Sequence, residues 1–148
     1  MQKKRLLNIL IYNKNMKKRI NINNNDYKEY SETYSSIEIE IEIKPVVNKY
    51  DKIINFKRED EKYYHIYFNN DKKEIKRNYL NENDNIEKIQ IMIDYQIKSF
   101  GKLFYNCKCI KYICFNKFYR NNINNMGYMF CGCSSLKELN LSILILIM

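Results

Sequence analysis

The sequence predicts a mainly β chain in which a small antiparallel N-terminal sheet caps a short solenoid of about two repeats. One observation is the strict alternation of isoleucine and glutamate in residues 36–44, SIEIEIEIK. A second is a stretch in the C-terminal half that repeats itself at a fixed interval. The third is composition, because the apolar residues are mostly Ile and Tyr, which favour strands, and the chain has a single Pro.

Residues 1–35 are predicted to be a loosely ordered leader, because they are basic and then Asn-rich and keep no apolar period. The opening segment MQKKRLLNILIYNKN has no small-residue cleavage site after its short apolar run, so it is a poor signal peptide. On that ground we expect a cytoplasmic protein. No apolar run reaches the roughly 18 residues that are needed to cross a bilayer.

Residues 36–95 are predicted to form the capping sheet, with roughly four or five mostly antiparallel strands. Period-2 alternation places Ile37, Ile39, Ile41 and Ile43 on the buried face of the first strand and Glu38, Glu40 and Glu42 on its wet face. Pro45 is expected to end that strand, because it has no N–H for the ladder. The further strand-like segments are residues 52–56, 63–68, 73–77 and 86–97, with a turn at 69–71.

Residues 96–148 contain the repeat. The segments IKSFGKLFYNCKCIKYICF and INNMGYMFCGCSSLKELNL fall into register when the second is moved back by 26 positions. The pairs that match are Ile97 with Ile123, Gly101 with Gly127, Phe104 with Phe130, Cys107 with Cys133 and Lys111 with Lys137. Repetition at a fixed period of this size is typical of a solenoid, in which one small unit stacks on the next.

The second copy, MGYMFCGCSSLKELNLS, resembles a leucine-rich repeat of the BspA type, a family of surface proteins built of tandem repeats of the same length. Its residues at the family's apolar positions are Met126, Met129, Phe130, Cys133, Leu136, Leu139 and Leu141. The first copy supplies Phe100, Leu103, Phe104, Cys107, Ile110, Ile113 and Phe115 in the same frame. The resemblance implies that these side chains form the repeat core, and it implies a cell-surface location as the alternative.

The residues between the core positions are expected to face outward on the concave side of the solenoid. Period-2 alternation turns Leu139 and Leu141 inward from a short strand. The outward residues are then Glu138, Asn140 and Ser142 in the second copy and Tyr112, Cys114 and Asn116 in the first. We predict that this face contacts a protein partner.

The apolar end SILILIM departs from the polar turn that follows the first copy. Stacked repeats generally need about three units and a polar terminal cap. We therefore interpret the chain as a truncated copy of a longer array, and we expect poor solubility and self-association through residues 143–148.

The five cysteines do not form a recognisable metal site or disulfide framework, because their number is odd and the two C-x-C pairs are out of phase. Cys109 aligns with Ser135 and Cys131 with Tyr105, whereas Cys107 and Cys133 are equivalent and read as small buried hydrophobes. The alternatives to buried free thiols are zinc binding by these cysteines and disulfide pairing between them. The sole histidine, His65, is interpreted as a structural or surface residue.

No phosphate loop, dinucleotide fingerprint or nucleophile elbow is present, so we predict a non-enzymatic protein with no cofactor, no metal and no catalytic residue. The formal charge of +9 and the 14 tyrosines leave nucleic-acid binding as the alternative function. The lysines are scattered, apart from two clusters near the start, which is typical of a solvated surface. A protein-interaction or adhesion module is therefore the favoured prediction.

Overall fold

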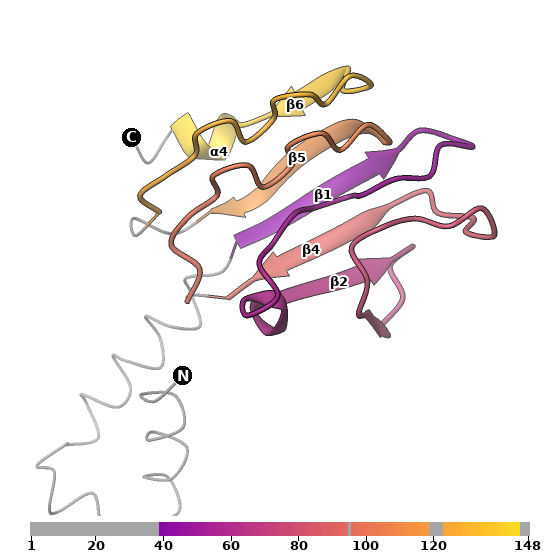
Figure 1. Cartoon of the computed structure of the whole chain (residues 1–148), viewed down its shortest axis with the longest axis horizontal. Coiled ribbons are helices and arrows are strands. Elements are labelled where there is room, and N and C mark those ends of the chain that lie inside the picture. Colours follow the sequence, from indigo (N-terminus) through magenta and orange to yellow (C-terminus); the bar gives the residue numbers. More distant parts are fainter. Residues whose placement is uncertain (1–38, 95, 119–122, 146–148) are drawn as a thin grey trace, which may run out of the picture. The chain divides into compact units, whose positions relative to one another are not determined.

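The computed structural model describes residues 39–94, 96–118 and 123–145, and these residues form one open, mixed sheet of six strands. The strands are β1 (Ile39–Pro45), β2 (Tyr64–Phe68), β3 (Glu74–Ile75), β4 (Ile89–Ile93), β5 (Ile110–Phe118) and β6 (Glu138–Asn140). Their order across the sheet is β3-β2-β4-β1-β5-β6 (Figure 1). Helical structure in the described residues is limited to the 3-10 turn η1 (Glu61–Tyr63) and the short helix α4 (Ser142–Ile145). The prediction of a mainly β chain is confirmed.

β1 is one of the two middle strands, and it pairs antiparallel with β4 on one side and with β5 on the other. Its alternation is as predicted: Ile39, Ile41 and Ile43 are fully buried, while Glu40 and Glu42 face the opposite side. Pro45 is its last residue. Since β5 belongs to the repeat, the predicted cap and the predicted repeat region share one sheet. The predicted leader, residues 1–35, and the predicted strand positions Ile37 and Glu38 lie outside the described residues.

The turn predicted at residues 69–71 joins β2 and β3, which pair as an antiparallel hairpin. Asn69 and Asn70 follow β2 with positive φ angles of 52° and 62°, a conformation that Asn tolerates better than most residues. The Asn69 side chain also fixes the next loop, since its amide donates to the Asn85 carbonyl and its oxygen accepts from the Glu87 N–H. Ile66 and Tyr67 of β2 pair with β3 in antiparallel register.

Residues 52–56 form no regular strand, in contrast to the prediction. Ile53 and Ile54 are adjacent yet both fully buried, which a two-sided strand with one wet face does not allow. The Ile53 N–H donates to Asn78, and the Asn55 N–H donates to Leu103. This segment therefore crosses between two parts of the chain and closes one end of the core.

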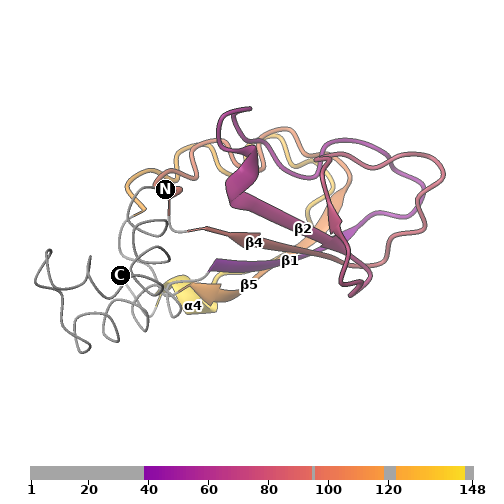
Figure 2. The same cartoon turned by 90° about the horizontal axis from the view of Figure 1, so that it is seen from below.

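The core lies on one side of the sheet, where the turn-rich segments before β5 and β6 run along its length (Figure 2). Phe100, from the first of these segments, packs against β5, with ring centroids 6.5 Å from Phe115 and 6.1 Å from Phe118. Phe100 and Phe104 are fully buried, as are the inward isoleucines of β1 and β4. This arrangement leaves the other side of the sheet to its polar side chains.

The two copies of the repeat lie next to each other in parallel register. Between β5 and β6 the paired residues are Tyr112 with Glu138, Ile113 with Leu139 and Cys114 with Asn140. Ser99 and Asn125 form an isolated parallel bridge ahead of the strands. Each of these pairs keeps the 26-residue interval of the sequence repeat.

The turns before β5 and β6 repeat at the same interval. Each turn is closed by a hydrogen bond from a backbone N–H to the carbonyl three residues earlier. In the first copy the donors are Leu103, Tyr105 and Cys107, and the acceptors are Phe100, Lys102 and Phe104. In the second copy the donors are Met129, Cys131 and Cys133, and the acceptors are Met126, Tyr128 and Phe130. Positive φ angles recur at Lys102 (60°) and Tyr128 (55°), and at Asn106 (57°) and Gly132 (77°). The sequence repeat is thus also a repeat of backbone conformation.

Candidate interaction face

Five of the six residues predicted to face a partner lie on the two adjacent strands β5 and β6. Tyr112 lies opposite Glu138, and Cys114 lies opposite Asn140. Asn116 continues along β5 beyond the last pair. Ser142 departs from the prediction, because it begins α4 instead of extending β6. Its N–H donates to the Asn140 side-chain oxygen at 3.0 Å, and this hydrogen bond turns the chain out of the strand.

The exposure of these side chains is uneven. Asn116, Glu138, Asn140 and Ser142 are exposed, and Tyr112 is half-buried. Cys114 departs from the prediction, because only 9% of its surface is accessible. It lies between Glu42 of β1 and Asn140 of β6, so its small side chain is covered by longer neighbours on both sides.

The polar side of the sheet extends this face across β1 and β4, which the sequence analysis did not foresee. Gln90 of β4 lies opposite Glu42 of β1, and Glu42 lies opposite Cys114 of β5. The row therefore runs from β4 to Asn140 of β6. The Ile/Glu alternation placed the glutamates on a wet face, but it carried no information on which strand would lie beside β5.

Two carboxylates organise the charges of this face. Glu40 receives hydrogen bonds from Gln90 at 2.8 Å and from Asn116 at 3.5 Å, and its carboxylate lies 3.2 Å from the Lys117 ammonium. Burial opposes ionisation of Glu40, but the contacts with Lys117 and the two amides outweigh it, so its pKa lies below its usual value. Glu42 lies 3.0 Å from the Lys88 ammonium and 4.0 Å from that of Lys44.

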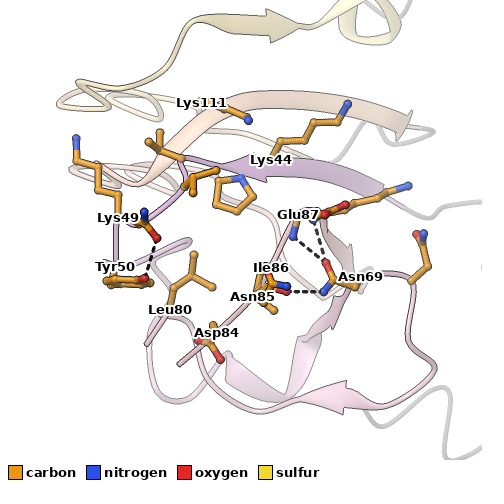
Figure 3. A pocket seen from close by; sticks show the side chains of 16 residues that line it. Lys44, Lys49, Tyr50, Asn69, Leu80, Asp84, Asn85, Ile86, Glu87 and Lys111 are labelled. Atoms are coloured by element: carbon orange, nitrogen blue, oxygen red, sulfur yellow. Dashed lines mark hydrogen bonds between the residues drawn. The ribbon is translucent and has the colours of Figure 1, made fainter. Parts of the chain in front are cut away.

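A cleft of about 800 Å³ opens beside the end of β1, next to this face. Figure 3 shows Lys44, Lys49 and Lys111 on one side of it and Leu80 and Asp84 on the other. The Lys49 ammonium donates to the Ser135 hydroxyl at 2.6 Å and so links the loop after β1 to the second copy of the repeat. The lining mixes lysines, carboxylates, amides and apolar side chains.

Lys44 connects the cleft to the face. Its ammonium lies 4.9 Å from the centre of the Tyr112 ring. A small hollow of about 120 Å³ is lined by Lys44 and Tyr112 together with Lys111, Lys137 and Glu138. The cleft and the polar face are therefore continuous at the end of β1.

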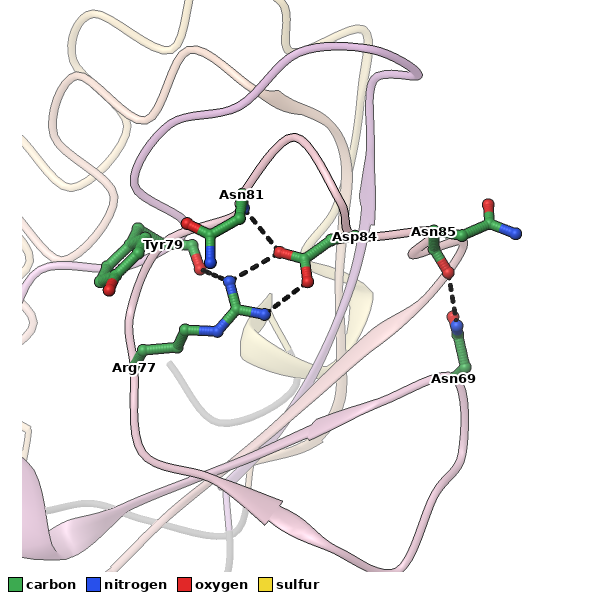
Figure 4. Close-up of polar contacts among 6 residues, drawn as sticks. All are labelled: Asn69, Arg77, Tyr79, Asn81, Asp84 and Asn85. Atoms are coloured by element: carbon green, nitrogen blue, oxygen red, sulfur yellow. Dashed lines mark hydrogen bonds and ion pairs between the residues drawn. The ribbon is translucent and has the colours of Figure 1, made fainter.

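The wall of the cleft is held by an ion pair between Arg77 and Asp84 (Figure 4). Both guanidinium NH groups lie 2.6 Å from the two oxygens of Asp84, and Arg77 also donates to the Tyr79 carbonyl. The hydrogen bonds from Arg77, with a further one from the Asn81 N–H, lower the pKa of Asp84 against the opposing effect of burial. This bidentate geometry is among the strongest that two side chains can form.

Comparison of the chain with protein-family models, curated proteins and solved structures finds no significant match.

The residues with reactive side chains serve structural contacts in the described part of the chain. His65 of β2 lies between two carboxylates, with Nδ1 3.1 Å from Glu74 and Nε2 3.2 Å from Asp94. The hydrogen bond from Lys76 lowers the pKa of Glu74, with a smaller contribution from His65. No group of three or more His, Cys, Asp or Glu residues that could hold a metal ion occurs within residues 39–94, 96–118 and 123–145. None of the helices described there is long and apolar enough to cross a membrane.

The thiols of the repeat are mostly buried. Burial raises the pKa of Cys107 and Cys133, and it raises that of Cys109 to about 11. The Cys133 thiol donates to the Phe104 carbonyl at 2.9 Å, so it serves as a contact between the two copies. All five cysteines are free thiols, and Cys131 is exposed.

The predicted repeat core differs between its two copies. The seven side chains of the first copy are buried. In the second copy Met129 is buried, and Phe130, Cys133, Leu136 and Leu141 are partly buried. Met126 and Leu139 depart from the prediction, with 38% and 41% of their surfaces exposed, because no described segment covers the outer side of the second copy.

Proposed function

We propose that this chain is a non-enzymatic protein-interaction module whose contact surface is the polar face of β5 and β6, extended by Glu40 and Glu42 of β1. The observation that carries this proposal is the side-by-side placement of Tyr112 with Glu138 and of Cys114 with Asn140. Side chains on a rigid sheet can be presented to a partner without loss of loop entropy on binding. The adjoining cleft at Lys44 would enlarge the contact.

We further propose that residues 97–141 are two turns of a solenoid of the leucine-rich-repeat type, with β1 to β4 as its cap. The parallel register of 26 residues supports this, as do the recurring turns and positive φ angles. The BspA-type pattern of apolar residues in the sequence also supports it. In such an architecture the outward residues of adjacent turns line one continuous binding surface.

A non-enzymatic role is supported by the state of the reactive groups in the described residues. Burial raises the pKa of the Cys107 thiol, and a thiol that stays protonated is a poor nucleophile. His65 is held on both sides by carboxylates. Neither group borders the cleft beside β1.

A protein partner is favoured over nucleic acid because the positive charge beside Glu40 and Glu42 is opposed by their carboxylates. Lys117 is paired with Glu40, and Lys88 is paired with Glu42. A surface that follows a phosphate backbone needs cations free to replace counterions. Glu138 adds another negative charge to the face.

The proposal is tested by photo-crosslinking in an extract of the cells that make the chain. A light-activated crosslinker replaces Glu138 on the face in one variant and Glu82, an exposed residue of the loop after β3, in the other. We expect the crosslinker at position 138 to capture a defined protein that an excess of unmodified chain displaces, whereas a competitor carrying Asn116→Arg and Asn140→Arg fails to displace it. Equal capture from both positions would contradict the proposal. Capture that nuclease or high salt abolishes would favour the nucleic-acid alternative.

A further inference from the structure

Between residues 100–106 and 125–131 the two copies of the repeat are joined by a row of four backbone hydrogen bonds that point the same way, whereas at either end of this row Asn124 and Lys137 donate in the opposite direction. In the first copy the N–H groups of alternate residues donate to carbonyls of the second. The pairs are Phe100 to Asn125 (2.7 Å), Lys102 to Gly127 (2.9 Å), Phe104 to Met129 (2.9 Å) and Asn106 to Cys131 (2.9 Å). Each copy therefore has a donor side and an acceptor side.

The acceptor side of the first copy is closed by the loop after β1. The Asn55 N–H donates to the Leu103 carbonyl at 2.7 Å, and the Asn55 side-chain amide donates to the Tyr105 carbonyl at 2.8 Å. The same amide lies 3.3 Å from the Lys102 carbonyl. Leu103 and Tyr105 are the equivalents of Met129 and Cys131, so one asparagine supplies donors to two of the four carbonyls that a preceding copy would pair with.

The donor side of the second copy is open. The N–H groups equivalent to those of the first copy belong to Met126, Tyr128, Phe130 and Gly132, and within the described residues none of them has an acceptor. The side chains on this side are also uncovered, since Tyr128 is 71% exposed and Leu139 is 41% exposed. Ile113, the equivalent of Leu139, is fully buried.

We propose that this open end, defined by Met126, Tyr128, Phe130, Gly132 and Leu139, is a docking surface for a polypeptide segment in the same 26-residue frame. Such a segment offers a row of carbonyls on alternate residues, which matches the four donors. Its phenylalanine equivalent would stack on Phe130 as Phe130 stacks on Phe104. This surface is separate from the polar face of β5 and β6, and the inference rests on the proposed solenoid register of the two copies.

Another molecule of this same chain does not fit the open end. Two open ends brought face to face would set N–H donors against N–H donors. A head-to-tail arrangement needs the carbonyls of Leu103 and Tyr105 in the second molecule, which Asn55 already occupies. The docking segment must therefore bring an acceptor side that no loop covers.

The test inserts a further copy of residues 116–141 between Leu141 and Ser142 of the full chain, which continues the frame. Amide hydrogen exchange is then followed by NMR. We expect the N–H groups of Met126, Tyr128, Phe130 and Gly132 to exchange at least about tenfold more slowly than in the unmodified chain, as buried hydrogen-bonded amides do. The midpoint of thermal unfolding should rise as well.

The control is the same insertion with Phe130, Leu136 and Leu139 of the inserted copy each replaced by Ser. It keeps the length and the carbonyls but removes the apolar contacts, so the four amides should exchange as in the unmodified chain. Unchanged exchange in the first insertion, or equal slowing in the control, would overturn the proposal. Concentration-dependent protection of the same amides in the unmodified chain would assign the surface to self-association instead.

Discussion

The rings of Phe104 and Phe130 are stacked, with centroids 5.8 Å apart and planes only 4° apart. They occupy equivalent positions in the two copies of the repeat. Phe104 is fully buried because the second copy covers it, whereas Phe130 is partly buried because its outer side has no such cover. The stacking of this pair reflects the register in which the two copies are joined, and the partial exposure of Phe130 reflects the open end of the second copy.

The two phenylalanines should therefore contribute unequally to stability. Phe104→Ala removes a ring from a closed core, and we expect it to lower the free energy of unfolding by about 3–5 kcal/mol. Phe130→Ala removes a ring that is already partly in water, and we expect a loss of about 1–2 kcal/mol. Urea unfolding of the two variants measures both values. A larger loss for Phe130→Ala would mean that its outer side is covered in solution.

Asn55 should be a sensitive position although it lies in a loop. Its side-chain amide donates to the carbonyls of Leu103 and Tyr105 at 3.4 and 2.8 Å, and the Cys107 thiol is a second, longer donor to the Tyr105 carbonyl at 3.9 Å. We expect Asn55→Ala to cost about 0.5–1.5 kcal/mol, because the Tyr105 carbonyl loses its shortest hydrogen bond. Asn55→Asp should cost more, since a carboxylate would face carbonyl oxygens.

The matched control for Asn55 is Asn83→Ala, in an exposed turn, which should change the free energy of unfolding by less than about 0.5 kcal/mol. Thermal and urea unfolding of the three variants give the comparison. If Asn55→Asp were as stable as the parent chain, Asn55 would not be closing the acceptor side of the first copy.

The ion pair between Arg77 and Asp84 predicts a defined loss of stability in acid. Because the pKa of Asp84 is lowered in the folded chain, its contribution is fully present above the usual Asp range near pH 4 and is lost as the pH falls through the folded pKa. We expect Asp84→Asn to cost about 1–3 kcal/mol at pH 7. The difference from the parent chain should shrink below about pH 4.

Urea unfolding at several pH values checks this dependence, with Glu82→Gln, an exposed carboxyl, as the control. A stability difference for Asp84→Asn that stays constant from pH 7 to about pH 2 would exclude the lowered pKa as its cause.

The thiols should differ in reactivity in the folded chain. Cys131 is exposed, whereas Cys107 and Cys109 are buried and have raised pKa values. Since the thiolate is the reactive form, we expect one fast reaction with a disulfide reagent at pH 8 and slow reaction of the buried thiols. Cys131→Ser should remove the fast phase. If the fast phase survived that substitution, the buried thiols would be more accessible than the fold allows.

The regular patterns of the sequence predicted the elements that depend on them. The Ile/Glu alternation of β1 placed Ile39, Ile41 and Ile43 in the core, and the repeat interval predicted which residues of β5 lie opposite β6. Asn69 and Asn70 predicted the turn between β2 and β3 through their tolerance of positive φ. These features are set by local chemistry or by period, so a single sequence contains them.

Long-range pairing was not predictable in the same way. Nothing in residues 39–45 indicates that β1 would lie beside β5, so the contribution of Glu40 and Glu42 to the polar face was missed. The segment 52–56 has the composition of a strand, but its two adjacent isoleucines are both buried by separate parts of the chain. The exposure of Met126 and Leu139 depends on what covers the second copy, which the repeat pattern alone does not state.

The most direct test of this account is amide hydrogen exchange of the unmodified chain, compared at equivalent positions of the two copies. We expect slow exchange at Phe100, Lys102, Phe104 and Asn106, whose N–H groups are bonded to the second copy. We expect fast exchange at Met126, Tyr128, Phe130 and Gly132, whose N–H groups form the open end. Equal rates in the two sets would contradict the stacked register from which both the proposed solenoid and the docking surface are inferred.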